Sequence, residues 1–249
     1  MLNSPPPLTV PAQLPAQLRA DGWAVLDAAG LSGLVGLNRE AFAGWPELWQ
    51  TLPPDPHLRD GGHYRNRRHG CFVATKRGEL QPVAQRAHWQ PVSYNALHGG
   101  FERWFEALDP ALAASPAWAV LLLALARVAN GLRGTQDWFI EAHPFRIHTE
   151  GAGGIGRPTP EGAHRDGVDL VAVMLVDRHN VKGGETRVFD AHGPAGVRFT
   201  LTEAFSVLLL DDERVIHEST PIQPLDPELP AWRDTLVLTL RAGTFQGPA

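Results

Sequence analysis

The stretch GVDLVAVMLV at residues 167–176 is the strongest indication of a core strand in the chain, and it decides the expected fold. Its β-branched and aliphatic residues favour a buried strand. From Trp138 onward, similar short runs rich in Val, Ile, Leu, Thr and Phe are separated by Gly, Pro, Asn and Asp, which is typical of strands and turns. These runs predict strands over residues 138–148, 168–177, 185–190, 197–202, 206–211, 214–219 and 233–241. Because no helix intervenes, we expect a largely antiparallel sandwich or barrel.

The first half of the chain has a mixed pattern with a helical bias. Residues 22–27 predict a short strand, and apolar spacing predicts helices over residues 31–50, 101–107 and 116–132. We therefore expect one domain over residues 1–249, with a proline-rich N-terminal arm (1–15), a helix-rich flanking part (16–135) and the barrel core (136–249). A flexible glycine loop is expected at residues 151–156.

Composition and net charge limit the classes of binding partner that we expect for this chain. A net charge of -5 gives no broad basic field that would attract nucleic acid or an anionic membrane. The single cysteine, Cys71, forms no internal disulfide, so a reducing, cytoplasmic setting is expected. The N-terminus lacks the pattern of a secretion signal, and the apolar run at residues 117–126 is about half of the roughly 20 residues that span a bilayer. A small-molecule substrate is the expected partner.

A metal-binding pattern lies directly before the core strand. A non-haem Fe(II) centre that activates oxygen needs two imidazoles and one carboxylate on one face of the ion, with the other positions open. Residues two apart on a strand point to the same side, so His164 and Asp166 can bind one ion together. His217 lies on a later predicted strand that can face them across a barrel. The sequence therefore predicts an iron site at these three residues.

The triplet alone is weak support for a metal site. Eleven histidines and 27 acidic residues in 249 positions predict roughly one His-x-Asp/Glu triplet by chance, and the chain has two. His148-Thr149-Glu150 runs into the glycine loop, whereas His164-Arg165-Asp166 precedes the core strand. The second triplet is therefore preferred.

A co-substrate such as 2-oxoglutarate would supply an independent test, because its distal carboxylate needs a buried cation, preferably the planar fork of arginine. Arg233 opens the last predicted strand, and Thr235 shares its face by the period of two. We expect both to bind that carboxylate. Arg241 has the same parity but lies at the far end of the strand.

Four ordered segments resemble those of the 2-oxoglutarate- and Fe(II)-dependent dioxygenases, and within them the bacterial L-isoleucine dioxygenase type of amino acid hydroxylases. They are EGAHRDGVD (161–169), RHNVKGGET (178–186), DDERVIH (211–217) and WRDTLV (232–237). Weaker similarity lies in GGHYR (61–65) and SYNALHGG (93–100). The spacing between His217 and Arg233 is longer than in many members, and the proline-rich residues 221–230 fill it.

The resemblance implies a double-stranded β-helix, which is a jelly-roll, cupin-like barrel with flanking helices. It also implies Fe(II), 2-oxoglutarate and O2 as the reactants that oxidise a substrate, with iron bound by His164, Asp166 and His217 and the co-substrate by Arg233. The expected reaction is hydroxylation, or sulfoxidation, of a free L-amino acid or derivative. Three alternatives stay open: a peptide or secondary metabolite as substrate, a barrel that binds metal or ligand without turnover, and a cupin-like enzyme without 2-oxoglutarate.

An amino acid substrate would need a cation for its carboxylate. The locally basic run at residues 63–69 is one place to find that cation. Arg65 in this run, and Arg146 further along the chain, are candidate substrate residues. The dipeptide Gly183-Gly184 is interpreted as a hairpin turn.

Overall fold

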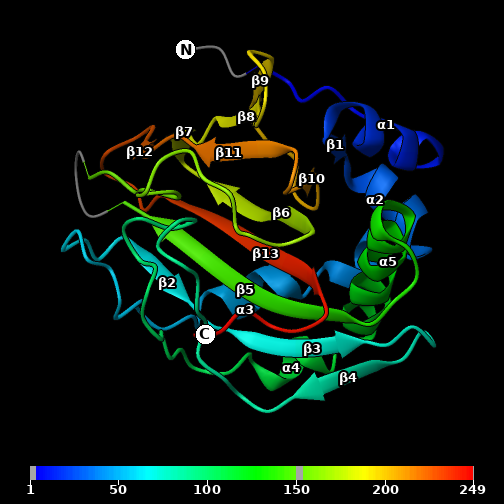
Figure 1. Cartoon of the computed structure of the whole chain (residues 1–249). Coiled ribbons are helices and arrows are strands. Elements are labelled where there is room, and N and C mark those ends of the chain that lie inside the picture. Colours follow the sequence, from blue (N-terminus) through cyan, green and yellow to red (C-terminus); the bar gives the residue numbers. More distant parts are fainter. Residues whose placement is uncertain (1–3, 150–153, 249) are drawn as a thin grey trace.

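The computed structural model describes residues 4–149 and 154–248, and its largest element is an eight-stranded antiparallel sheet (Figure 1). Seven strands follow the order β1-β10-β6-β13-β5-β3-β4, and β2 also pairs with β5. The strands are β1 (Trp23–Leu26), β2 (Arg65–Arg67), β3 (Gly70–Ala74), β4 (Leu80–Val83), β5 (Trp138–His148), β6 (Leu170–His179), β10 (Val207–Asp211) and β13 (Trp232–Ala242). The long strands β6, β13 and β5 lie side by side at its centre.

A smaller layer covers one face of this sheet. It contains the sheet β11-β8-β9 and the pair β12-β7, with bounds β7 (Val181–Gly183), β8 (Thr186–Asp190), β9 (Gly196–Phe199), β11 (Val215–Ser219) and β12 (Ile222–Pro224). Together with the large sheet it forms the double-stranded β-helix that the family resemblance implies. The proline-rich insertion before Arg233 thus contributes β12 to the barrel.

The two glycines interpreted as a hairpin turn have another role. Gly183 ends β7 and Gly184 leads to β8, but β7 pairs with β12 and β8 pairs with β11 and β9. The prediction was wrong because a local sequence pattern cannot tell a hairpin from a crossing between strand pairs. Both glycines have positive φ, and a Cβ on Gly183 would lie 2.2 Å from the Pro221 carbonyl oxygen. Only glycine fits this crossing.

The helices lie on the other side of the large sheet and at one end of it (Figure 1). The predicted helix over 116–132 is confirmed as α5, which starts with a proline at its first position, where a missing N–H costs nothing. Within the described residues, no helix is long and apolar enough to cross a membrane. The helices are η1 (Pro11–Gln13), α1 (Leu14–Asp21), α2 (Ala28–Val35), η2 (Arg39–Phe42), α3 (Trp45–Trp49), α4 (Pro110–Ala113) and α5 (Pro116–Arg133).

The helix predicted over residues 101–107 does not form. Instead the segment is extended, and Arg103 exchanges backbone hydrogen bonds with His88 at 2.9 and 3.0 Å. Arg103 and Phe105 are buried, whereas Trp104 between them is 56% exposed, so burial follows the period of two typical of extended chain. Four strands, β1 to β4, also come from the part expected to be helix-rich. That part therefore completes the large sheet as well as flanking it.

Alternation along the central strands separates two environments. On β13, Leu236, Leu238 and Leu240 face the helices and belong to the larger apolar core. Arg233, Thr235, Val237 and Thr239 alternate with them and line a cavity inside the barrel. On β5 the side chains alternate in the same way. Ile140 and Ala142 pack against the helices, whereas the cavity is lined by His143, Phe145 and Ile147. The strand period therefore builds a polar interior on an apolar support.

The N-terminal arm is tied to the barrel where it is described. The Thr9 amide donates to the Val25 carbonyl at 2.8 Å, and the Thr200 amide donates to the Ser4 carbonyl at 2.9 Å. Residues 1–3 of the arm and residues 151–153 of the predicted glycine loop lie outside the described residues.

The core between α5 and the sheet gives a test of the packing. Trp118 is 1% exposed and packs against Phe72 and Trp45, with ring centroids at 5.5 and 5.9 Å. We expect Trp118→Ala to lower the free energy of unfolding by about 3–5 kcal/mol, because it leaves a large cavity. Urea denaturation measures this change. Trp104→Ala, at an exposed position, should leave the midpoint almost unchanged; equal losses in both variants would contradict the packing described.

Candidate active site

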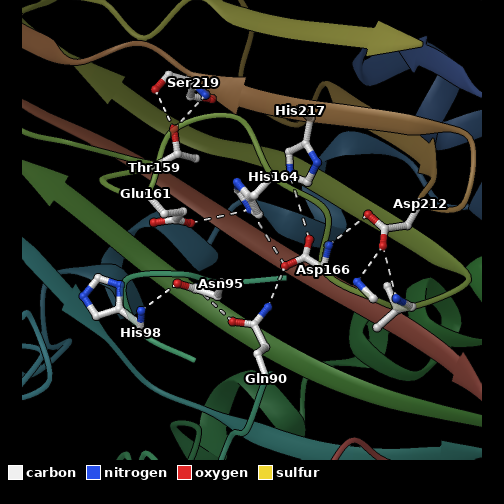
Figure 2. A network of polar contacts seen from close by, with 12 residues as sticks. Gln90, Asn95, His98, Thr159, Glu161, His164, Asp166, Asp212, His217 and Ser219 are labelled. Carbon is white, nitrogen blue, oxygen red and sulfur yellow. Dashed lines mark hydrogen bonds and ion pairs between the residues drawn. The ribbon is translucent and has the colours of Figure 1, made fainter. Parts of the chain in front are cut away.

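The two histidines of the predicted triad are joined through their backbones. His164, in the segment before β6, and His217, on β11, form an isolated antiparallel bridge with N–O distances of 3.0 and 2.9 Å. Their imidazole rings lie 4.6 Å apart between centroids. Figure 2 shows both rings and the Asp166 carboxylate pointing toward a common point. Residues 53 positions apart in sequence are therefore held in register by the main chain.

The donor atoms converge at a spacing that suits one metal ion. Asp166 Oδ1 lies 3.9 Å from His164 Nε2, and Asp166 Oδ2 lies 3.8 Å from His217 Nε2. The three donor atoms lie within 4.8 Å of one another. His164 Nδ1 lies 3.0 Å from the Gly162 carbonyl oxygen; a proton on Nδ1 would donate there and leave the Nε2 lone pair free for a metal.

The loop that carries Asp166 is fixed by a second aspartate. The buried Asp212 carboxylate accepts hydrogen bonds from the backbone amides of Asp166, Gly167 and Val168 at 3.1, 2.7 and 3.1 Å (Figure 2). Burial, and then the charge of Asp166, raise the pKa of Asp212 to about 7. The three amides oppose this shift, which shows that they stabilise the carboxylate.

Two further polar residues contact the triad. The Gln90 side-chain amide donates to Asp166 Oδ1 at 3.1 Å and accepts from Asn95 and Arg103 at 3.1 and 2.9 Å. Glu161 Oε1 lies 3.6 Å from His164 Nε2. Its other oxygen, Oε2, is buried and has no hydrogen-bond partner among the described residues. Gln90 therefore orients one triad carboxylate oxygen, and Glu161 places a second carboxylate beside the triad.

Electrostatics show that the triad is a costly arrangement without a cation. Burial raises the pKa of Asp166 and lowers the pKa of His217 well below its usual range. Burial also opposes the charged form of His164, but the charges of Asp166 and Glu161 outweigh it and raise the pKa of that imidazole. Buried carboxylates are disfavoured unless a positive charge compensates them. A divalent metal ion would supply that charge.

Arg233 and Thr235 line the same cavity as the triad, on adjacent inward positions of β13. Arg233 is buried, and its Nε and Nη2 have no hydrogen-bond partner among the described residues. Arg178 is its register partner on β6. Burial, and next the like charge of Arg178, lower the pKa of Arg233 to about 10, so it stays charged at neutral pH. Among the described residues, no carboxylate forms a salt bridge with either of these two adjacent guanidiniums, which favours a bound anion.

The two predicted substrate arginines differ in position. Arg65 lines the cavity, but its Nε and Nη2 each lie 2.7 Å from Asp55 Oδ2. Arg146 does not line it: its guanidinium donates to both Asp234 oxygens at 2.8 and 2.6 Å and lies 5.0 Å from the Trp232 ring centroid. The structure therefore brings Arg65 to the site and places Arg146 elsewhere.

A second buried group, missed in the sequence, also converges. It consists of His69, His88, Glu141 and His143, whose donor atoms lie within 4.8 Å of one another. Glu141 and His143 sit two apart on β5 and so share a face. In the sequence, Glu141 and His143 form a Glu-x-His pattern, which is the reverse order of a His-x-Asp/Glu triplet. The two partners from other segments, His69 and His88, carry no local pattern that would reveal them.

Comparison with known proteins places this geometry in a family. A family model described as 2OG-Fe dioxygenase matches residues 46–239. A solved structure of a bsmA homolog from Methylobium petroleophilum PM1 is 56% identical, with all of both chains covered and a TM-score of 0.92. A search of curated proteins found no match.

Two more distant structures share the fold. IDO from Bacillus thuringiensis is 14% identical, with 95% of this chain and 100% of that chain covered and a TM-score of 0.73. The Fe(II)/(alpha)ketoglutarate-dependent dioxygenase TqaL is 20% identical, with 93% and 86% covered and a TM-score of 0.70. The chain belongs to the 2OG-Fe dioxygenase family. It is accordingly an enzyme that uses Fe(II), 2-oxoglutarate and O2 to oxidise a small molecule.

The role of Asp212 can be tested through metal affinity. We expect Asp212→Ala to weaken Mn(II) binding by roughly 10–100-fold, because the loop that carries Asp166 loses its three amide contacts. Isothermal titration calorimetry measures the affinity. Glu213→Ala, which removes a neighbouring exposed carboxylate, serves as the control and should bind Mn(II) normally. Equal affinities in the two variants would show that Asp212 does not position the metal site.

Proposed function

We propose that His164, Asp166 and His217 hold the iron and that Arg233 binds the distal carboxylate of 2-oxoglutarate. The observation that carries this proposal is the shared cavity. Two imidazoles and a carboxylate converge at one point, and a buried guanidinium with two unpartnered nitrogens lines the same space. Two histidines and one carboxylate leave coordination positions open for a chelating 2-oxo acid.

The triad fits iron better than the four-residue group does. His69, His88, Glu141 and His143 offer four protein donors, which would leave less room for a chelating co-substrate. Arg67 Nη2 lies 2.7 Å from His143 Nδ1 and donates a hydrogen bond to it, so the other ring nitrogen of a neutral His143 carries the proton. In the triad, no guanidinium contacts a donor nitrogen of either histidine among the described residues.

Arg178 and Thr235 complete the proposed co-substrate site. Arg178 Nη2 donates to the carbonyl oxygens of Val181 and Gly183 at 3.1 and 2.9 Å, while its buried Nη1 has no partner among the described residues. The Thr235 hydroxyl can donate to the carboxylate that Arg233 binds. Gly184 keeps this region open, because a Cβ there would lie 3.3 Å from Arg178 Nη1 and from Arg233 Cδ.

The proposed reaction is hydroxylation, or sulfoxidation, of a free L-amino acid or derivative, coupled to decarboxylation of 2-oxoglutarate to succinate. Bound iron and 2-oxoglutarate supply the oxidising chemistry. The chain's own residues orient both reactants: Gln90 fixes Asp166, Asp212 fixes its loop, and Arg233 anchors the co-substrate. The apolar side chains of Phe145, Ile147, Val173 and Val237 also line the cavity and exclude water from it.

The amino acid assignment rests on the four motifs that resemble the L-isoleucine dioxygenase type and on the buried cations of the cavity. A peptide substrate would fit this cavity less well. A long peptide would have to insert one side chain among several buried charged groups, whereas the two charges of a small free amino acid can pair with such groups directly.

A substrate panel tests the proposed function. The enzyme, loaded anaerobically with Fe(II), is given 2-oxoglutarate, air and each of the 20 common L-amino acids in turn. We expect at least one amino acid to stimulate succinate formation and to gain 16 Da. Stimulation only by peptides or other metabolites would overturn the amino acid assignment. Iron binding without any 2-oxoglutarate decarboxylation would favour a barrel that binds without turnover.

The metal ligands have a matched control in the rival triplet. We expect His164→Ala and Asp166→Ala each to abolish iron binding and turnover, because two remaining ligands seldom hold a labile divalent ion. His148→Ala should keep about one iron per chain. Iron content by plasma emission spectroscopy and circular dichroism separate loss of metal from loss of fold. Full iron content in either triad variant would contradict the assignment.

The co-substrate anchor can be tested without turnover. We expect Arg233→Met to weaken binding of N-oxalylglycine, an inert analogue of 2-oxoglutarate, by about 100-fold, because a charge-assisted bidentate contact is lost. Calorimetry with Mn(II)-loaded protein measures this affinity. Arg241→Met is the control, since Arg241 Nη1 donates to the Thr244 carbonyl outside the cavity. Unchanged affinity in Arg233→Met would remove Arg233 from the co-substrate site.

A further inference from the structure

The cavity has a second cationic region besides the one at Arg233. Three arginines line it: Arg65, Arg67 and Arg103, which are 6%, 3% and 2% exposed. Arg65 and Arg67 point inward from β2, and Arg103 comes from the extended segment paired with His88. Arginine is rarely buried without a compensating negative charge.

The carboxylate contacts in this region are unevenly distributed among the three arginines. Asp55 neutralises Arg65 through contacts of 2.7 Å and lies 4.0 Å from Arg67. Glu141 contacts imidazoles, not guanidiniums, among its described partners. Arg103 is held by the neutral Gln90 amide at 2.9 Å. Among the described residues, Asp55 is the one carboxylate within 4.0 Å of these three guanidiniums, and the buried Nε atoms of Arg67 and Arg103 have no hydrogen-bond partner.

Two of the histidines beside these arginines, His88 and His143, add no positive charge to the region. Burial, which outweighs the attraction of Glu141, lowers the pKa of His88 to about 3. Burial also lowers the pKa of His143 well below its usual range, and the charges of neighbouring cations add to this effect. Both imidazoles are therefore neutral at physiological pH. Glu161 Oε1 lies 3.6 Å from His164 Nε2. Burial, and next the charge of Arg65, lower the pKa of Arg103 to about 10, and the charges of Asp55, Glu161 and Glu141 oppose this shift.

A bound anion fits this region better than a second metal ion. The ring centroids of His69 and His143 lie 4.8 Å apart, and those of His88 and His143 lie 4.6 Å apart. These distances would suit imidazoles that bind a common cation. However, the neighbouring guanidiniums of Arg67 and Arg103 would repel a dication there, and His143 Nδ1 already accepts a hydrogen bond from Arg67. An anion would instead accept hydrogen bonds from the unpartnered Nε atoms of Arg67 and Arg103.

We propose that Arg67 and Arg103 form the receptor for a carboxylate of the substrate. This inference rests on the proposed function and assigns which residues recognise the substrate's acid group. Arg67 lies between the rings of Phe105 and Phe145, with centroid distances of 3.8 and 4.4 Å, so its guanidinium is fixed in orientation. Arg103 is fixed by Gln90, whose amide also contacts Asp166.

The chain of contacts sets the geometry of the complex. A carboxylate on Arg103 lies one amide away from Asp166, so the rest of the substrate extends toward the triad. The proposed receptor does not consist of the two arginines suggested by the sequence. Arg65 already forms a salt bridge with Asp55, and Arg146 forms one with Asp234. Arg67, from the same basic run as Arg65, and Arg103, from the extended segment paired with His88, lack such carboxylate partners at hydrogen-bond distance in the described residues.

The first experiment uses iodide as the probe and needs no known substrate. Crystals of the wild-type enzyme are soaked in sodium iodide, and anomalous scattering locates the bound ions. We expect iodide between the guanidiniums of Arg67 and Arg103, and a second ion at Arg233 as an internal control. Iodide at Arg233 alone, or no iodide anywhere in the cavity, would overturn the proposal.

The second experiment separates substrate from co-substrate recognition. We expect Arg103→Gln to leave the Kd for N-oxalylglycine within about twofold, because the co-substrate binds at Arg233. Arg68→Gln is the matched control, since Arg68 belongs to the same basic run but does not line the cavity. A loss of N-oxalylglycine affinity in Arg103→Gln with none in Arg233→Met would exchange the two sites and overturn the proposal.

The third experiment uses the most active amino acid of the panel and its carboxamide. We expect Arg103→Gln to raise KM for the acid by roughly 100-fold, the value of a lost charge-assisted contact, with a smaller change in kcat. The KM for the carboxamide should change much less. Equal changes for acid and carboxamide would show a structural role only. If no amino acid is turned over, the substrate class of the proposed function fails, and the iodide result still decides whether the anion receptor exists.

Discussion

The structure depends on the alternation of side chains along three adjacent strands, β5, β13 and β6. One face of these strands must be apolar because it packs against the helices, as Leu236, Leu238 and Leu240 do. The opposite face is then free to carry polar groups into the barrel. A shift of one residue in any of these strands would exchange the two faces, so the register that forms the core also fixes the site.

The fold could be predicted in the second half because its strands are short, apolar and separated by turn residues. The bounds of β5 agree with the prediction, and those of β6 and β13 differ by one or two residues at either end. In the first half the same reasoning was less successful. Residues 101–107 have apolar residues at a spacing compatible with a helix, but pairing with His88 makes them extended. Such pairing is a tertiary effect that a local pattern does not contain.

For the candidate site, too, a local sequence pattern identifies only some of the residues. His164 and Asp166 could be chosen because two residues of one triplet share a strand-like parity, and Arg233 and Thr235 because they share a face. The structure brings all four to one cavity with His217. Gln90, Asp212 and Glu161 could not be chosen, because their importance lies in contacts between distant segments. Whether an arginine is available to a ligand also depends on its partner: Asp55 and Asp234 distinguish Arg65 and Arg146 from Arg67 and Arg103.

The backbone bridge between His164 and His217 has a consequence for how the proposed iron site would take up and lose its metal. Both imidazoles are already placed by main-chain hydrogen bonds, and the loop of Asp166 is already tied by Asp212. Little conformational freedom is left to lose when an ion enters, in contrast to small zinc domains that fold only around their metal. We therefore expect the barrel to keep its shape without the ion, so that metal loss and reloading would be a reversible exchange that leaves the tertiary structure intact.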